Sequence, residues 1–301
     1  MSSFFDENVP LDYEGLCRAT MLLKKKYCCL TAFSIGKTVL GRSIPAYILG
    51  SGKPGALYVG GVHALEYITS MLLLKFTGEL CEYYTSQMQI GGYDLGRLLC
   101  TQSICIIPML NPDGVEIHLK GEESAGALGN SVQHISRGNY NAWQANARGV
   151  DLNHNFNAGF NILREEEIKS GITGPSLRQY GGCRPESEPE THALCNLCRR
   201  MFFSKAFAFH SQGEEIYWRY GERTPRTAFG MAKRLAASSV YTVAQPEGMA
   251  AHGGFKDWFI SVFARPGFTI EVGRGVNPLP VSELGDIYSK IFDMLVLGLF
   301  I

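Results

Sequence analysis

The sequence predicts an α/β fold in which a twisted central sheet carries helices on both faces. Short apolar runs alternate along the chain with longer stretches that have helical periodicity. The candidate site residues, which lie between residue 63 and residue 271, stand at the ends of the short runs. The 301 residues contain no internal repeat and no linker, so we expect one catalytic domain over residues 1–301.

Helices are expected where apolar residues form a helical stripe or where an acidic turn opens a stretch. The clearest stripe contains Ile68, Leu72, Phe76, Leu80 and Tyr83. The expected helices are 11–24, 68–84, 186–203, 225–238 and 282–300.

Strands are expected where a short apolar run ends at glycine, at a turn or at a polar residue. The run Ala56 to Val59 is followed by Gly60 and Gly61, which indicates a buried strand with a tight exit. The segment 116–182 is polar and rich in glycine without strong periodicity, so we expect a long functional or mobile loop there. The expected strands are 30–36, 43–50, 56–59, 103–110, 205–210 and 267–272.

The composition argues against several classes of protein. The chain is 46% hydrophobic and 19% charged, which is typical of a globular protein with a sizeable core. Lys plus Arg and Asp plus Glu both number 28, so no net charge favours nucleic acid. Residues 1–15 and 291–301 fit neither a signal peptide nor a transmembrane segment. Nine cysteines without a secretion signal favour a reducing, cytoplasmic location.

Two histidines and a glutamate stand where a metal site could form. His63 follows the strand 56–59, and Glu66 comes three residues later, so both can share one face of a helical turn. His210 ends the run 205–210. Taken singly, such residues are usually salt bridges, helix caps or structural histidines. Two histidines with one glutamate form one of the ligand sets of catalytic zinc, with a fourth position open for water.

Glu271 is the candidate general base. It lies in the apolar run 267–272, where a charge is costly unless it is paired or functional. Such a carboxylate can take a proton from water and pass it to a leaving amine. An ion pair with Arg274 or Lys256 is the alternative interpretation. Arg148 could supply the cation that stabilises negative charge on the attacked carbonyl.

From about Ile35 to Val272 the chain resembles the zinc metallocarboxypeptidase family, of which carboxypeptidase A is the best-known member. The resemblance rests on six motifs in the family's order: VGGVHALE, PMLNPDGVE, NARGVDLNHNF, FHSQG, GGFKDW and TIEVG. It implies a mixed sheet of about eight strands with helices on both sides. It also implies one zinc ion held by His63, Glu66 and His210, with Glu271 as general base.

The resemblance also implies substrate-binding residues. Asn153 matches the family asparagine that helps to bind the substrate's carboxylate. Arg148 is the best match for the arginine that polarises the scissile carbonyl, with Arg137 as a rival. His154 stands where the family has an arginine that clamps the free C-terminal carboxylate, so a bidentate cation has become a weaker, pH-sensitive donor.

Further departures concern the leaving side chain. Met249 replaces the family's mobile tyrosine, and His252 could partly substitute as a donor or be a satisfied loop histidine. Lys256 falls where the family sets specificity, so it could attract an anionic group or simply be solvated.

The motif GGFKDWF and the altered asparagine–arginine motif resemble the branch that cleaves peptidoglycan stem peptides between γ-D-glutamate and meso-diaminopimelate or lysine. We therefore expect a zinc peptidase with a peptide or muropeptide substrate. The alternatives are a conventional metallocarboxypeptidase, an N-acyl amino acid deacylase or, more remotely, a non-catalytic binding module.

Overall fold

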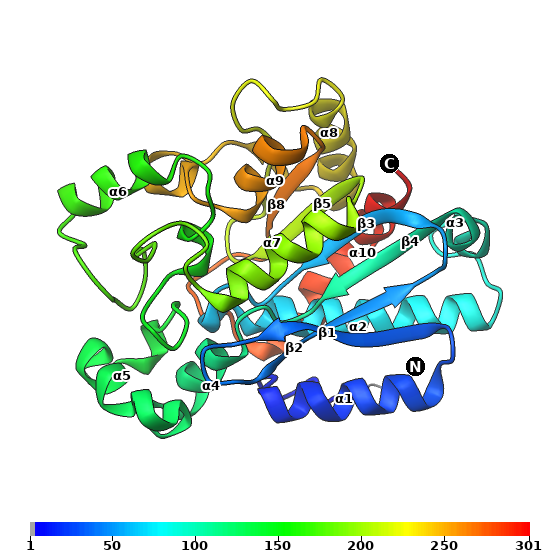
Figure 1. The fold of residues 1–301 in the computed structure, drawn as a ribbon. Helices are drawn as coiled ribbons and strands as arrows, with labels where there is room; N and C mark the ends of the chain where they lie inside the picture. Colours follow the sequence, from blue (N-terminus) through cyan, green and yellow to red (C-terminus); the bar gives the residue numbers. More distant parts are fainter. Residues whose placement is uncertain (1–3) are drawn as a thin grey trace.

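Eight strands form one mixed sheet in the computed structural model, which describes residues 4–301 (Figure 1). The strands are β1 (Leu30–Lys37), β2 (Ser43–Leu49), β3 (Lys53–Val59), β4 (Gln102–Ile107), β5 (Lys205–His210), β6 (Glu215–Tyr217), β7 (Thr242–Ala244) and β8 (Gly267–Glu271). Their order is β1-β2-β4-β3-β5-β8-β6-β7. The four central strands β4, β3, β5 and β8 are parallel, while β2 and β6 join them antiparallel. This confirms the predicted mixed sheet of about eight strands.

The carboxyl ends of the central strands bring the candidate site residues to one edge of the sheet. In the parallel β5–β8 pair His210 lies opposite Glu271, and in the β3–β5 pair Val59 lies opposite Ala208. The turn after β3 therefore places His63 at the same edge. Ligand sites in sheets of this type lie outside the carboxyl ends of the strands for this reason.

Helices cover both faces of the sheet. The α-helices are α1 (Tyr13–Lys26), α2 (Tyr67–Thr85), α3 (Leu95–Thr101), α4 (Pro112–Lys120), α5 (Gly129–Ser136), α6 (Phe160–Lys169), α7 (Pro189–Met201), α8 (Ala228–Ser239), α9 (Phe255–Phe263) and α10 (Leu284–Phe300). The 3₁₀ helices are η1 (Ala64–Glu66), η2 (Glu122–Leu128), η3 (Tyr140–Ala142), η4 (Leu152–His154), η5 (Gly248–Ala251) and η6 (Val281–Glu283). No helix in the described range 4–301 has the length and apolar character needed to cross a membrane.

Alternation along β3 divides the core into two layers. Tyr58 packs with α1, α2, α8 and α10 on one face, whereas Leu57 and Val59 pack with α7 and α9 on the other. In Figure 1, α7 crosses the near face, and α2 and α10 lie behind the sheet. Because both faces are covered, β3 and β5 are almost continuously apolar, as is usual for parallel strands.

The segment 116–182 is not the long loop that the sequence predicts. It holds the end of α4, η2, α5, η3, η4 and α6. Several of these short elements pack around Trp143 in a small apolar cluster that includes Ile117, Ala125 and Val132. These elements are only three to ten residues long, so none of them has a stripe that repeats over several turns, and the sequence pattern does not reveal them.

Candidate metal centre and active site

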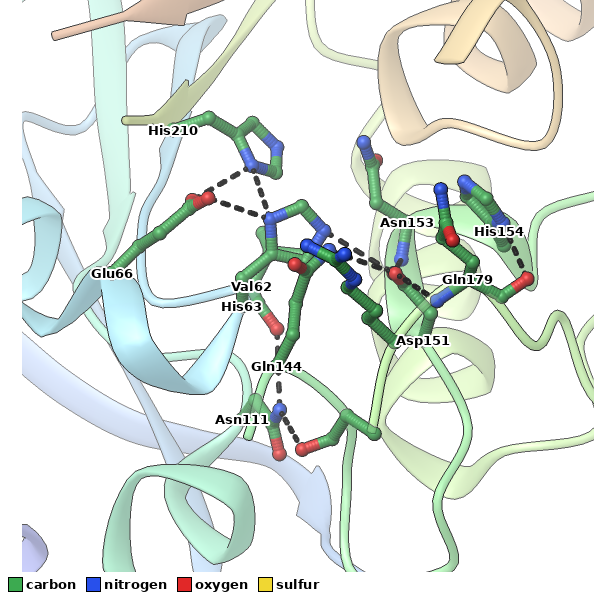
Figure 2. Close-up of polar contacts among 12 residues, drawn as sticks. Val62, His63, Glu66, Asn111, Gln144, Asp151, Asn153, His154, Gln179 and His210 are labelled. Atoms are coloured by element: carbon green, nitrogen blue, oxygen red, sulfur yellow. Dashed lines mark hydrogen bonds and ion pairs between the residues drawn. The ribbon is translucent and has the colours of Figure 1, made fainter. Parts of the chain in front are cut away.

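His63, Glu66 and His210 bring their ligand atoms together at the carboxyl edge of the sheet (Figure 2). The Nδ1 atom of His63 lies 2.9 Å from Oε1 of Glu66. The Nδ1 atom of His210 lies 3.1 Å from Oε2 of Glu66 and 3.2 Å from Nδ1 of His63. A tetrahedral zinc ion with bonds of about 2.0–2.1 Å separates its ligand atoms by about 3.3 Å. The three residues therefore fit one such ion.

The exit from β3 explains how His63 and Glu66 meet. Gly61 has a φ of +57°, and a Cβ atom there would lie 2.4 Å from Oγ of Ser70 and 2.9 Å from Cα of Met109. Only glycine suits so tight a turn. His63 is then extended, and η1 returns Glu66 to the side of the imidazole. The side-chain amide of Asn111 donates to the carbonyl of Val62 and holds the backbone just before His63.

The pKa shifts of Glu66 and His210 favour the forms that bind a metal ion, whereas that of His63 favours its protonated form. Burial works to raise the pKa of Glu66, but the charges of His63 and His210 and their hydrogen bonds outweigh it and lower the pKa to about 2. Burial by itself lowers the pKa of His210. Glu66 is therefore ionised and His210 is neutral, which are the forms that coordinate a metal ion. Burial lowers the pKa of His63, but Glu66 and Asp151 outweigh burial and raise it well above its ordinary value, so His63 must release a proton when a metal ion binds.

Asp151 orients His63 by binding the ring nitrogen that faces away from Glu66, and the sequence did not predict this role. Its Oδ1 atom lies 3.2 Å from Nε2 of His63 (Figure 2). Burial favours a neutral carboxyl, but His63 and His154 hold the pKa of Asp151 well below its ordinary value. An ionised carboxylate only accepts hydrogen bonds, so Nε2 of His63 carries a proton and Nδ1 is the nitrogen left to coordinate a metal ion. A buried acid between Val150 and Leu152 was the available signal.

The Asp151→Asn variant should bind zinc about 10- to 100-fold more weakly than the wild type, since the amide no longer fixes the His63 tautomer. Competition with a chromophoric chelator measures this affinity. Asp94→Asn is the matched control, because Asp94 only caps α3 and asparagine caps a helix equally well. Equal zinc affinity of Asp151→Asn and wild type would contradict the role of Asp151.

A pocket beside the cluster gathers most of the expected site residues. His63, Asn153, His154, Lys256 and Glu271 all line it. Gln144, Arg178, Gln179, Tyr217 and Asp257 also line it and were not expected. Gln144, Arg178 and Gln179 come from loops, whose place in space the sequence pattern does not reveal. Tyr217 ends the three-residue strand β6, and Asp257 lies on α9 next to Lys256.

Glu271 faces this pocket from the end of β8. Burial raises its pKa well above the ordinary value, and the negative charge of Glu66 raises it further. Among the described residues it forms no ion pair, since Arg274 binds Oε2 of Glu214 at 2.8 Å instead. An unpaired carboxyl with a raised pKa, next to a metal site, suits a general base that must later act as an acid.

His154 and Asn153 stand together on η4. The Nδ1 atom of His154 donates to the carbonyl of Gln179 at 2.9 Å and lies 3.6 Å from Oε1 of Glu167. Burial lowers the pKa of His154, but Asp151, Glu167 and this carbonyl together outweigh burial, so the pKa is raised. The Oδ1 atom of Asn153 accepts from the backbone of Phe255, which leaves the amide hydrogens as donors. The pair thus offers hydrogen-bond donors and partial positive charge.

Lys256 is not the solvated lysine of the alternative interpretation. Its side chain is only 3% exposed. The ammonium group donates to Oδ1 of Asp257 and, at 2.9 Å, to the carbonyl of Arg219. Burial raises the pKa of Asp257, and Lys256 counteracts this effect. The charge of Lys256 is therefore largely matched within the pocket wall.

Three expected residues lie elsewhere. Arg148 has a half-exposed side chain, 3.5 Å from Oε2 of Glu188, and lines a separate surface cavity. Arg137 is exposed at the end of α5. His252 lies with its Nδ1 atom 3.2 Å from the hydroxyl of Tyr220 and does not line the pocket. Neither arginine has a position that supports carbonyl polarisation.

The turn around Asn146 explains where Arg148 points. The side-chain oxygen of Asn146 accepts from the backbone N–H groups of Arg148 and Val150, and Gly149 has a φ of +72°. This tight turn puts the Arg148 side chain at the surface beside Glu188. The order of residues in the motif does not specify this direction.

Known proteins are similar to this chain in sequence and in fold. The family model described as zinc carboxypeptidase matches residues 19–290. The gamma-D-glutamyl-L-diamino acid endopeptidase 1 of Lysinibacillus sphaericus is 34% identical over 293 residues, which is 96% of this chain and 72% of that protein.

Solved structures agree on the fold. Bovine thrombin-activatable fibrinolysis inhibitor, in complex with tick carboxypeptidase inhibitor, aligns with a TM-score of 0.75 at 20% sequence identity. The alignment covers 98% of this chain and 97% of the fibrinolysis inhibitor chain. Carboxypeptidase A from Helicoverpa armigera aligns with a TM-score of 0.73 at 18% sequence identity, and the alignment covers 97% of this chain and 73% of the carboxypeptidase chain. With the match of the family model, these findings show that the chain is a metallopeptidase of the zinc carboxypeptidase family.

Proposed function

We propose that this peptidase hydrolyses the amide bond between γ-D-glutamate and a diamino acid, most favourably meso-diaminopimelate, in peptidoglycan stem peptides. The observation that carries the proposal is the set of hydrogen-bond donors that Asn153, His154 and Arg178 contribute to the lining of the pocket beside the metal ligands. The name of the Lysinibacillus relative, with which the chain shares 34% identity over nearly its whole length, supports the same bond.

In this proposal His63, Glu66 and His210 hold one zinc ion, which when bound polarises the scissile carbonyl and activates water. Glu271 accepts a proton from the attacking water at its carboxylate and later donates it to the leaving amine nitrogen. Asn153 and His154 hold the α-carboxylate of the leaving residue by hydrogen bonds. Holding that carboxylate fixes the scissile bond against Glu271, which is worth much of the rate through orientation alone.

The test is to incubate the zinc-loaded protein with the tripeptide L-alanyl-γ-D-glutamyl-meso-diaminopimelate and to read the product masses. We expect free diaminopimelate and the dipeptide, whose masses sum to the substrate plus one water. The same assay with simple C-terminal dipeptides and N-acyl amino acids tests the carboxypeptidase and deacylase alternatives. Cleavage of the tripeptide at another bond, or turnover only of those simple substrates, would contradict the proposed bond and identify the bond that the enzyme cleaves.

Two broader expectations stay predictions. One is a single catalytic domain over residues 1–301, and the other is a reducing, cytoplasmic location. All nine cysteines are free thiols in the structure, which supports the second.

A further inference from the structure

We propose that Arg178 determines specificity by binding a second carboxylate, at the side-chain end of the leaving residue, so that diaminopimelate is preferred to lysine. This inference rests on the proposed function and names the part of the substrate that the pocket reads. Nothing in the chain's motifs points to Arg178, which lies in the irregular stretch between α6 and α7.

Arg178 is a cation without a partner inside a concave site. It is exposed and lines the pocket together with His154 and Lys256. Its guanidinium forms no hydrogen bond or ion pair with any residue in the range 4–301. By contrast, Arg164 on nearby α6 binds Glu167 at 2.8 Å, and Arg199 on α7 binds Glu186. A free guanidinium in a pocket is suited to bidentate binding of a carboxylate.

The backbone on both sides of Arg178 is fixed to the metal centre's surroundings. On one side the carbonyl of Leu177 accepts from the N–H groups of Gln144 at 2.9 Å and Ala145 at 3.0 Å. On the other side the N–H group of Gln179 donates to Oδ2 of Asp151 at 3.0 Å.

The carbonyl of Gln179 in turn accepts from His154, as Figure 2 shows. The backbone of Arg178 is therefore fixed relative to Asp151 and His63, and only the Arg178 side chain has to be positioned when substrate binds. Such preorganisation lowers the entropic cost of recognition.

The cationic side chains of Lys256 and His154 have acidic neighbours, whereas Arg178 has none among the described residues and is available to bind an anion. Asp257 matches the charge of Lys256, and Glu167 lies beside His154. In the proposed function Asn153 and His154 take the α-carboxylate that every C-terminal residue carries. The free guanidinium then has no role unless the leaving residue brings a second carboxylate. Diaminopimelate and lysine both carry an ammonium group at the end of the side chain, but only diaminopimelate adds a carboxylate there, which Arg178 can bind.

The experiment compares two tripeptides that differ only in the third residue, meso-diaminopimelate or L-lysine. Arg178→Ala should lower kcat/KM for the diaminopimelate substrate roughly 10- to 100-fold and leave the lysine substrate nearly unchanged. Arg178→Glu should reverse the preference in favour of lysine. Arg184→Ala is the matched control, because Arg184 is also an exposed arginine but lines the separate cavity beside Arg148. An equal loss on both tripeptides, or no loss on diaminopimelate, overturns the proposal.

A binding measurement separates this inference from the proposed function. Isothermal titration with free meso-diaminopimelate and free lysine reports recognition without turnover. Weaker binding of diaminopimelate to Arg178→Ala than to wild type supports the inference even if neither tripeptide is cleaved, an outcome that refutes only the proposed bond. Equal binding to both proteins, or no binding of diaminopimelate to the wild type, overturns the role of Arg178.

Discussion

Replacing Glu271 with glutamine is expected to lower kcat about 10²- to 10⁴-fold without loss of zinc, because the amide cannot accept the proton of the attacking water. The substitution preserves the shape of the side chain at the end of β8. Glu271 is not one of the three residues whose ligand atoms converge, so metal content should not change. Steady-state kinetics with the muropeptide substrate measure kcat, and zinc analysis of the same enzyme sample measures the metal content.

Glu215→Gln is the control for this variant. Glu215 faces Glu271 across the β6–β8 pair and accepts a hydrogen bond from Tyr217 at 2.7 Å. The charge of Glu215 is a small contributor to the raised pKa of Glu271, so its removal tests whether loss of a nearby charge alone changes the rate. We expect a small change in rate compared with the loss in Glu271→Gln. If Glu271→Gln keeps its activity, another group must take the proton.

The His210→Ala variant should lose zinc affinity by more than the roughly 10- to 100-fold expected for Asp151→Asn, and its activity should fall with the bound metal. His210 supplies one of three ligand atoms, and the remaining pair, His63 and Glu66, cannot complete a tetrahedral site. Chelator competition measures the affinity, and thermal unfolding of the metal-free proteins separates metal loss from misfolding.

His192→Ala serves as the control, because His192 is exposed on α7 and lines only the separate surface cavity. It should bind zinc as the wild type does. Wild-type zinc affinity in His210→Ala would contradict the assignment of His210 as a ligand.

Expectation and structure agree most closely along the central strands. The predicted strand 205–210 has the bounds of β5, and the expected helix 68–84 differs from α2 by one residue at each end. Buried parallel strands are nearly continuous apolar runs, and a long amphipathic helix has a regular stripe, so both patterns are strong. The helix α9 was missed because its nine residues, FKDWFISVF, are too few for a stripe to repeat over several turns.

The sequence by itself determined the central strands and three residues able to hold a metal ion, with Glu271 beside them. Parallel strands end at one edge, so residues that close apolar runs must meet there whatever the loops do. Only the tertiary structure decided which cations enter the pocket. Arg148 turns outward at the Asn146 turn, whereas Arg178 is held at the pocket by the hydrogen bonds of Leu177 and Gln179. Those bonds join segments about thirty residues apart, and no local pattern specifies such contacts, because loop conformation depends on what the loop packs against.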